Sequence, residues 1–257
     1  MDQRTDDTAR REYVAGLEKG LAIIEAFGQR QTVLTLSEAA ELTGLSRAAA
    51  RRCLLTLEAL GYVKSDGKYF SLAPRVLRLG HAYMASTPLP RLVQPVIDAA
   101  SERSGESMSV TVLDDTEVVV IARALVHRSF VMSNGVGSRV PGHASAAGRV
   151  LLAALPEDTA AELLARMPRP KLTPRTPTEI GEILAILREA RARGYAVNDQ
   201  EAERGVRVLA VPLRDRNGTT VASLSQSISD EKGSIDKLVE RRLPALEAAR
   251  NRLTSLL

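Results

Sequence analysis

The stretch that decides the fold reads Ser46-Arg-Ala-Ala-Ala-Arg-Arg-Cys-Leu-Leu-Thr-Leu-Glu-Ala-Leu-Gly-Tyr62. At helical spacing its apolar residues fall on one side, because positions three and four apart share a helix face. The other side gathers alanines and three arginines near the N-terminal end. Arginine suits both forked contacts with guanine and contacts with phosphate, so the pattern predicts a helix that reads the major groove of DNA. The alternative is an ordinary solvated helix face.

The flanking residues predict a winged helix-turn-helix around this stretch. Residues 36–43 favour a short helix, with Thr35 or Ser37 as its N-cap. A tight turn at 44–46 leads into the reading helix, and Ser46 is expected to cap that helix. Residues 62–72 alternate around an Asp-Gly pair, which is typical of a β-hairpin. The residues expected to contact DNA are Thr35, Ser46, Arg47, Ala48, Arg51, Arg52, Lys64 and Lys68.

Positive charge is concentrated around this module. Residues 44–91 carry eight Lys or Arg against two acidic residues, whereas the formal net charge of the whole chain is only +4. Such a local excess is typical of a phosphate-binding surface. Aromatic residues make up 3% of the chain and Trp is absent, which disfavours recognition of single strands or RNA by stacking on bases. Double-stranded promoter DNA is therefore the expected partner.

Composition bounds the class of protein. A chain of 257 residues, 44% of them hydrophobic, is long enough for two domains with ordinary cores. The one cysteine, Cys53, is expected to be a small core residue, and it supports neither a disulfide framework nor a zinc site. Neither a secretion signal nor a run of about 18 apolar residues occurs. We expect a cytoplasmic protein with no membrane segment and no cofactor.

The pattern along the chain predicts an α+β protein. An apolar stripe at helical spacing is expected to pack behind the reading helix, at Leu17, Leu21, Ile24 and Phe27. Predicted strands of the second domain, in a mostly antiparallel sheet, are 106–113, 117–124, 208–214 and 219–227. Its predicted helices are 92–103, 145–155, 156–167, 178–193 and 234–257. The expected parts are a flexible tail at 1–12, the winged helix-turn-helix at 13–73, a linker helix at 74–90 and the second domain at 91–257. Within the linker, Pro88 and Pro90 are expected to stop the helix.

One helix start in the second domain predicts an anion site. Ser145, Ala146 and Ala147 open a helix with small side chains, so its backbone N–H groups stay accessible to a carboxylate. Ser225 and Ser227 lie two apart on a predicted strand and therefore share one face of the sheet. The alternative is that Ser145 only caps the helix and the serines only decorate an edge.

Both domains resemble the IclR-type transcriptional regulators. Residues 44–63 are similar to the branch that includes PcaU, PcaR and PobR, which regulate aromatic-acid catabolism. Residues 136–153 and 194–201 resemble the two signature segments of the family's effector domain. The resemblance covers residues 13–257. It implies a GAF-like α/β effector-binding domain at the C-terminal end and a regulator that binds DNA as a homodimer or a dimer of dimers, with RNA polymerase as a further candidate partner.

The resemblance also implies an effector and its binding residues. A small organic acid of the β-ketoadipate pathway is expected, such as protocatechuate or 4-hydroxybenzoate. Asn198 and Val208 stand where some members carry an acidic residue and a cysteine, which favours a less polar ligand with a ring. Met132 is expected near the pocket mouth and His143 in the pocket or its turn. The full expected set is Met132, His143, Ser145, Ala146, Ala147, Asn198, Val208, Ser225 and Ser227.

Two alternatives belong to other functional classes. A DNA-binding protein without a ligand would have no use for the anion site. A small hydrolase would use Ser145 as nucleophile and His143 as base, with Asp199 orienting it. No glycine flanks Ser145 as a hydrolase elbow requires, and the three histidines are too far apart in the chain to form a metal-binding pair. We therefore do not expect an enzyme.

Overall fold

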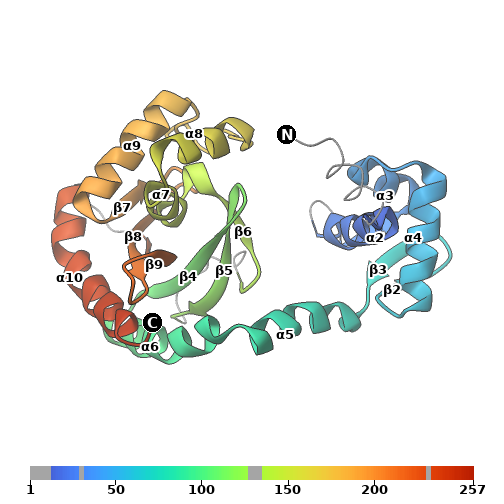
Figure 1. Ribbon diagram of the computed structural model, residues 1–257, viewed down its shortest axis with the longest axis horizontal. Coiled ribbons are helices and arrows are strands. Elements are labelled where there is room, and N and C mark those ends of the chain that lie inside the picture. The colour runs from blue at the N-terminus through green and yellow to red at the C-terminus, as the bar shows by residue number, and fades with distance from the viewer. Residues whose placement is uncertain (1–12, 29–31, 127–134, 230–232) are drawn as a thin grey trace, which may run out of the picture. The chain divides into compact units, whose positions relative to one another are not determined.

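The computed structural model describes residues 13–28, 32–126, 135–229 and 233–257 (Figure 1). The chain forms two compact units that divide between Tyr83 and Met84. Within the described ranges, no helix is both long enough and apolar enough to cross a bilayer.

The first unit contains the predicted winged helix-turn-helix. Its three strands form an antiparallel sheet in the order β1-β3-β2, and the β2–β3 hairpin is the predicted wing. The strand β1 is only three residues long and was not predicted. The elements are α2 (Ala15–Ala26), β1 (Val33–Thr35), α3 (Leu36–Thr43), α4 (Arg47–Ala59), β2 (Val63–Ser65) and β3 (Tyr69–Leu72).

Caps define the two central helices, as the sequence predicts. The Thr35 hydroxyl accepts the N–H of Glu38 at 3.3 Å, and the Glu38 carboxylate accepts the N–H of Thr35 at 2.7 Å, which completes a capping box. Gly44 ends α3 in the left-handed region at φ 66°. The Ser46 hydroxyl then accepts the N–H of Ala49 at 3.2 Å and starts α4.

The predicted apolar stripe of α2 is wrong in part. Ile23 and Phe27 are buried against the core of the first unit, but Leu17 and Leu21 are 64% and 43% exposed. The buried residues of α2 are Ile23 and Ala26, and Ile24 packs only partly buried against the same core. Leu17 and Leu21 consequently lie on a neighbouring face of α2.

The linker region is more helical than predicted. After a short 3-10 turn η1 (Pro74–Val76), α5 (Leu77–Ser86) is followed at once by α6 (Pro88–Ser104). The prolines expected to stop the helix instead begin the next one, because a proline in the first turn lacks only an N–H that would have no partner there.

The second unit is built on a six-stranded antiparallel sheet in the order β6-β5-β4-β9-β8-β7. The short strands β6 and β7 were not predicted. The strands are β4 (Ser107–Asp114), β5 (Glu117–Ala124), β6 (Arg139–Pro141), β7 (Ala196–Asp199), β8 (Val206–Arg214) and β9 (Thr220–Ser229). The remaining elements are the 3-10 turn η2 (Gly142–Ala144) and the helices α7 (Ala146–Ala153), α8 (Glu157–Arg166), α9 (Ile180–Arg193) and α10 (Ile235–Thr254).

Helices cover both faces of this sheet, as Figure 1 shows. On one face of the sheet, Ile97 of α6 and Leu246 of α10 pack against strand residues such as Val110. On the other face, α7, α8 and α9 form a second core with Leu152, Leu164 and Ile183. Small residues on α7 bring this helix close to the sheet and leave its first turn over β8 and β9.

Gly148 allows the closest approach in the second unit. A Cβ atom built on Gly148 would lie 2.2 Å from the carbonyl oxygen of Gly142 and 2.5 Å from its Cα. Both atoms are backbone, so a side-chain movement cannot relieve the contact. Only glycine therefore lets α7 pack against η2 at this point.

Gly148→Ala should destabilise the second unit by about 1–3 kcal/mol, as overpacking of a tight core does. The control is Gly181→Ala, because Gly181 lies in α9 with nothing within 4 Å of its would-be Cβ, and alanine there should be neutral or stabilising. Thermal unfolding of both variants checks this. Equal midpoints for the two would show that the contact at Gly142 is relaxed.

Candidate functional site

The exposed face of α4 carries the residues expected to contact DNA. Ala50, Leu54 and Leu57 are buried in the core of the first unit. Arg47 and Arg51 are one turn apart and exposed on another side of the helix. Their guanidinium groups can therefore reach a groove while the helix stays packed.

Arg52 lies on a different side of α4. One residue corresponds to about 100° around a helix, and this rotation moves Arg52 away from the face of Arg47 and Arg51. It lines a groove of about 730 Å³ together with α2, whose apolar walls include Leu17 and Leu21. Cys53 also lines this groove and is half-buried against the core.

The wing presents its lysines at a well-defined tip. The Asp66 carboxylate accepts the N–H groups of Lys68 at 2.9 Å and Tyr69 at 2.7 Å. These backbone hydrogen bonds, first that of Tyr69, lower the pKa of Asp66. Lys64 and Lys68 are exposed, and the Lys68 ammonium lies 4.9 Å from the centre of the Tyr69 ring.

A second site is a cavity of about 110 Å³ under the first turn of α7, here called the α7 pocket. The structure brings together most of the residues expected at the anion site. Those that line it are Ser145, Ala146, Ala147, Asn198, Val208, Ser225 and Ser227.

The start of α7 offers two backbone donors to this pocket. The Ser145 hydroxyl accepts the N–H of Gly148 at 3.0 Å, so Ser145 is the N-cap. The N–H groups of Ala146 and Ala147 have no acceptor within the helix. Their small side chains and the positive end of the helix dipole suit this turn to a carboxylate.

A buried ion pair holds α7 over the sheet. The guanidinium of Arg149, only 1% exposed, pairs with the carboxylate of Glu201 after β7. It also donates to the carbonyl oxygens of Val197 at 3.0 Å and His143 at 3.3 Å. One side chain thus joins η2, α7 and β7 beside the pocket.

Three of the expected pocket residues have other placements or other partners. The Asn198 amide donates to the carbonyl oxygen of Ala144 and accepts the N–H of Glu201 at 3.1 Å, so both of its ends already have protein partners. His143 is fully buried outside the pocket lining, and its Nε2 lies 3.3 Å from the carbonyl oxygen of Pro170. Met132 lies outside the described residues.

The hydrolase alternative finds no support in these contacts. Burial lowers the pKa of His143, whose nearest described polar partner is a carbonyl group and not Ser145. Asp199 forms ion pairs with Arg207 and Arg175. Each of the three residues is held by a different partner.

The sequence reasoning missed the pocket residues contributed by β4 and β5. Ser109, Thr111 and Arg123 all line the α7 pocket. The Thr111 hydroxyl and the Arg123 Nε are buried, and neither has a hydrogen-bond partner in the part of the chain that the structure describes. An arginine in the valine-rich strand 117–124 was the available signal.

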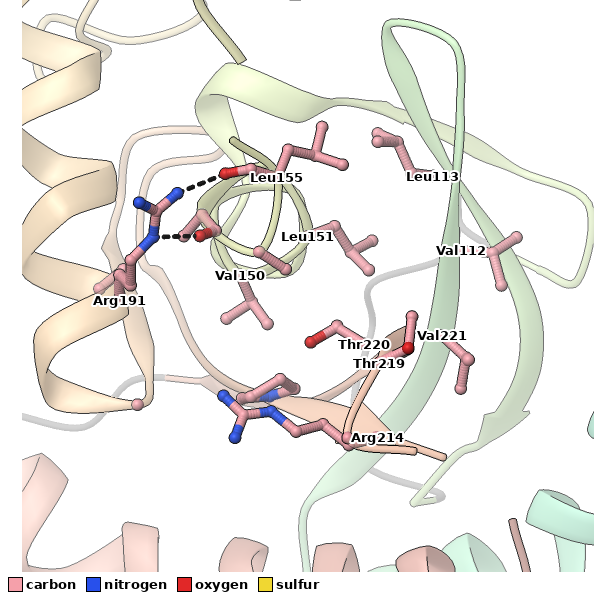
Figure 2. A pocket seen from close by; sticks show the side chains of 16 residues that line it. Val112, Leu113, Val150, Leu151, Leu155, Arg191, Arg214, Thr219, Thr220 and Val221 are labelled. Carbon is pink, nitrogen blue, oxygen red and sulfur yellow. Dashed lines mark hydrogen bonds between the residues drawn. The ribbon is translucent and has the colours of Figure 1, made fainter. Parts of the chain in front are cut away.

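A larger cavity of about 650 Å³ opens at the other end of α7 (Figure 2). Val150 and Leu151 point into it from α7 and face Thr220 and Val221. Arg191 donates to the carbonyl oxygens of Ala153, at 2.6 Å, and Leu155, as the dashed lines in Figure 2 mark. This cavity therefore meets the carbonyl end of α7, and the open amides belong to the α7 pocket.

Comparisons with known proteins identify the family of both domains. The family "Bacterial transcriptional regulator IclR C-terminal" matches residues 81–253, and "IclR helix-turn-helix domain" matches residues 16–67. The chain is 39% identical to the Pca regulon regulatory protein of Pseudomonas putida over 93% of this chain and 82% of that protein. It is 35% identical to the p-hydroxybenzoate hydroxylase transcriptional activator of Acinetobacter baylyi over 98% and 95% of the two chains.

A solved structure shares the whole fold. An IclR homolog from Microbacterium hydrocarbonoxydans, crystallised in complex with 4-hydroxybenzoate, superposes with a TM-score of 0.74 at 25% identity. The match covers 93% of this chain and 98% of that chain. The relatives that share both domains are named transcriptional regulators, not enzymes. The chain belongs to the IclR family of bacterial transcriptional regulators.

Proposed function

We propose that a small aromatic acid, such as protocatechuate or 4-hydroxybenzoate, controls the binding of this regulator to promoter DNA. The observation that supports the proposal is the α7 pocket, where two free helix amides face a polar strand. Relatives named for the pca regulon and for p-hydroxybenzoate hydroxylase, and a homolog complexed with 4-hydroxybenzoate, support the same class of ligand.

The pocket provides groups for both parts of such an acid. The amides of Ala146 and Ala147 would accept the carboxylate at the positive end of α7. Ser225 and Ser227, on the strand opposite, would add hydroxyl donors, and Val208 would lie against the ring. The Ser225 hydroxyl lies 3.4 Å from the carbonyl oxygen of Ser109, which is a long contact that a ligand can replace.

The DNA contacts proposed for the first unit fall into two kinds. Arg47, Ala48 and Arg51 on α4 would face base edges in the major groove. Lys64 and Lys68 of the wing would contact phosphate. Thr35 and Ser46 already cap helices, so they would act by placing backbone N–H groups near the phosphates. The position of Arg52 suits a contact with the flank of the groove.

Specific binding by this unit requires two copies, because one reading helix covers only a few base pairs. We therefore propose a homodimer or a dimer of dimers. Its candidate contacts are exposed apolar residues of the first unit and of α5. They include Leu17, Leu21, Leu79 and Tyr83.

Arg47→Ala and Arg51→Ala should each weaken operator binding by about 1–3 kcal/mol. Each should also relax the sequence preference, as loss of a base contact does. Lys68→Ala should weaken all sequences alike and flatten the dependence on salt. Gel shifts at several salt concentrations measure both effects. Unchanged operator affinity in a variant that lacks both arginines would rule out α4 as the reading helix.

Combining Ser225→Ala with Ser227→Ala should abolish the response to the acid in a protein that still folds and still binds its operator. Hydrogen bonds to a charged group contribute about 1.5–3 kcal/mol each, so the dissociation constant should rise about a hundredfold or more. Ala147→Leu should act similarly by filling the space beside the free amides.

The measurement is a thermal-shift screen of protocatechuate and 4-hydroxybenzoate followed by calorimetric titration, because a bound ligand stabilises the folded state. If the parent binds an acid and both variants bind it equally well, the ligand lies elsewhere. If the parent binds no acid, the ligand-independent alternative is favoured.

A further inference from the structure

An irregularity in the sheet aims Arg123 into the α7 pocket. In the β4–β5 ladder Thr111 pairs with Val120, but Val110 pairs with Ala122. Ile121 is thus an extra residue with no partner on β4. This is a β-bulge, which locally shifts the alternation of side chains between the two faces.

The consequence can be followed along β5. Before the bulge, Val118 and Val120 line the pocket. After it, Ala122 and Ala124 join the core under α6 and α10, and Arg123 lines the pocket. Without the extra residue, Arg123 would follow Ile121 onto the apolar side of the sheet.

Among the described residues, the charge of Arg123 has no counterpart. Within the described part of the chain, its guanidinium forms no hydrogen bond and no ion pair, and its Nε is buried. Burial lowers the pKa of Arg123. Glu203, which also lines the pocket, is exposed and makes no ion pair with it. Arg123 is half-buried, so its charge is partly removed from water without a partner in the described residues. Partial burial of an unpaired charge is unfavourable, and an anionic ligand would offset that cost.

Arg123 lines the pocket from β5, two strands away from Ser225 on β9. A single row across the sheet runs from Arg123 through Ser109 to Ser225. Two strand spacings separate its ends by about 10 Å. Thr111, whose hydroxyl is also unpartnered, lies one row away on the same face as Ser109. The pocket therefore has polar side chains on β4 and β5 as well as on β9.

We propose that Arg123 binds a second polar group of the effector and so selects acids that carry an anionic or acceptor oxygen opposite their carboxylate. The inference rests on the proposed function, because it requires the first carboxylate to bind at the start of α7. The ligand class is thus a hydroxy-aromatic acid or a dicarboxylic acid, and acids with one polar end are disfavoured.

The test compares two matched pairs of acids by calorimetry on the full-length protein. In each pair one acid has polar groups at both ends and the other only at one: 4-hydroxybenzoate against 4-methylbenzoate, and adipate against hexanoate. The variant is Arg123→Met, which keeps an unbranched side chain about as long as the aliphatic part of arginine but removes the guanidinium and its charge. The control is Arg214→Met, which makes the same substitution at an arginine that lines a different cavity, the larger one of Figure 2.

Arg123→Met should weaken binding of the preferred two-ended acid about tenfold or more, as loss of a charge-assisted hydrogen bond does. The matched one-ended acid should change by less than about threefold. Arg214→Met should change neither. The unliganded Arg123→Met protein should melt at the same temperature as the parent or higher, since an unpaired cation has been removed; a purely structural arginine would lower that temperature.

Four results would overturn the inference. Equal weakening of both members of a pair would place Arg123 at the first carboxylate. If Arg123→Met weakens binding of none of the acids that the parent binds, Arg123 does not contact the ligand. The proposed function would then still stand. An effect of Arg214→Met alone would move the ligand to the larger cavity. If the parent binds neither protocatechuate nor any of the four acids, the proposed function and the inference both fail.

Discussion

The buried ion pair between Arg149 and Glu201 is the interaction on which the α7 pocket depends. Arg149 lies on α7, and Glu201 follows β7 about fifty residues later in the chain. The backbone of Glu201 is fixed in turn, because its carbonyl oxygen accepts hydrogen bonds from the hydroxyls of Thr173 and Thr176. Removing one partner would leave a buried charge, which costs about 3–5 kcal/mol. This pair therefore sets where the first turn of α7 lies over the sheet.

The two ends of α7 consequently have opposite electrostatic roles. At the C-terminal end Arg191 donates to the last carbonyl oxygens, so the negative end of the helix dipole meets a cation of the same chain. At the N-terminal end Ser145 takes only the N–H of Gly148, and the first two amides stay available. The N-terminal end of α7 therefore lacks a protein counterpart of the kind that Arg191 provides at the other end, as far as the described residues show. The small side chains that expose these amides, together with Gly148, are also what lets the helix come so close.

Local patterns were sufficient for much of the fold and of the site. The caps at Thr35 and Ser46 and the wing hairpin were predicted because they depend on residues within a few positions of one another. The spacing of Ser225 and Ser227 and the small residues at 146–147 likewise indicated pocket positions. Long-range features were not visible. Ile23 and Ile24 are adjacent, so two apolar stripes fit α2 and only packing against α4 decides between them.

Arg123 illustrates the same limit at the site. Strict alternation from Val118 and Val120 places Arg123 with Ile121, on the face of the apolar core. The extra residue in β5 reverses this assignment, and a bulge depends on how β4 pairs with β5. The short strands β6 and β7, of three and four residues, were missed for a similar reason, since their pairing with neighbours defines them more than their composition does.

Amide hydrogen exchange of Glu201→Gln tests most directly whether the ion pair positions α7. The control is Glu157→Gln, because Glu157 pairs with Arg188 in an exposed bridge that should contribute little. In Glu201→Gln, exchange in α7 and β7 should accelerate by about two orders of magnitude or more, while α6, α10 and the first unit keep their protection. Glu157→Gln should leave α7 unchanged. Full protection of α7 in Glu201→Gln, or a loss spread evenly over the second unit, would contradict this account.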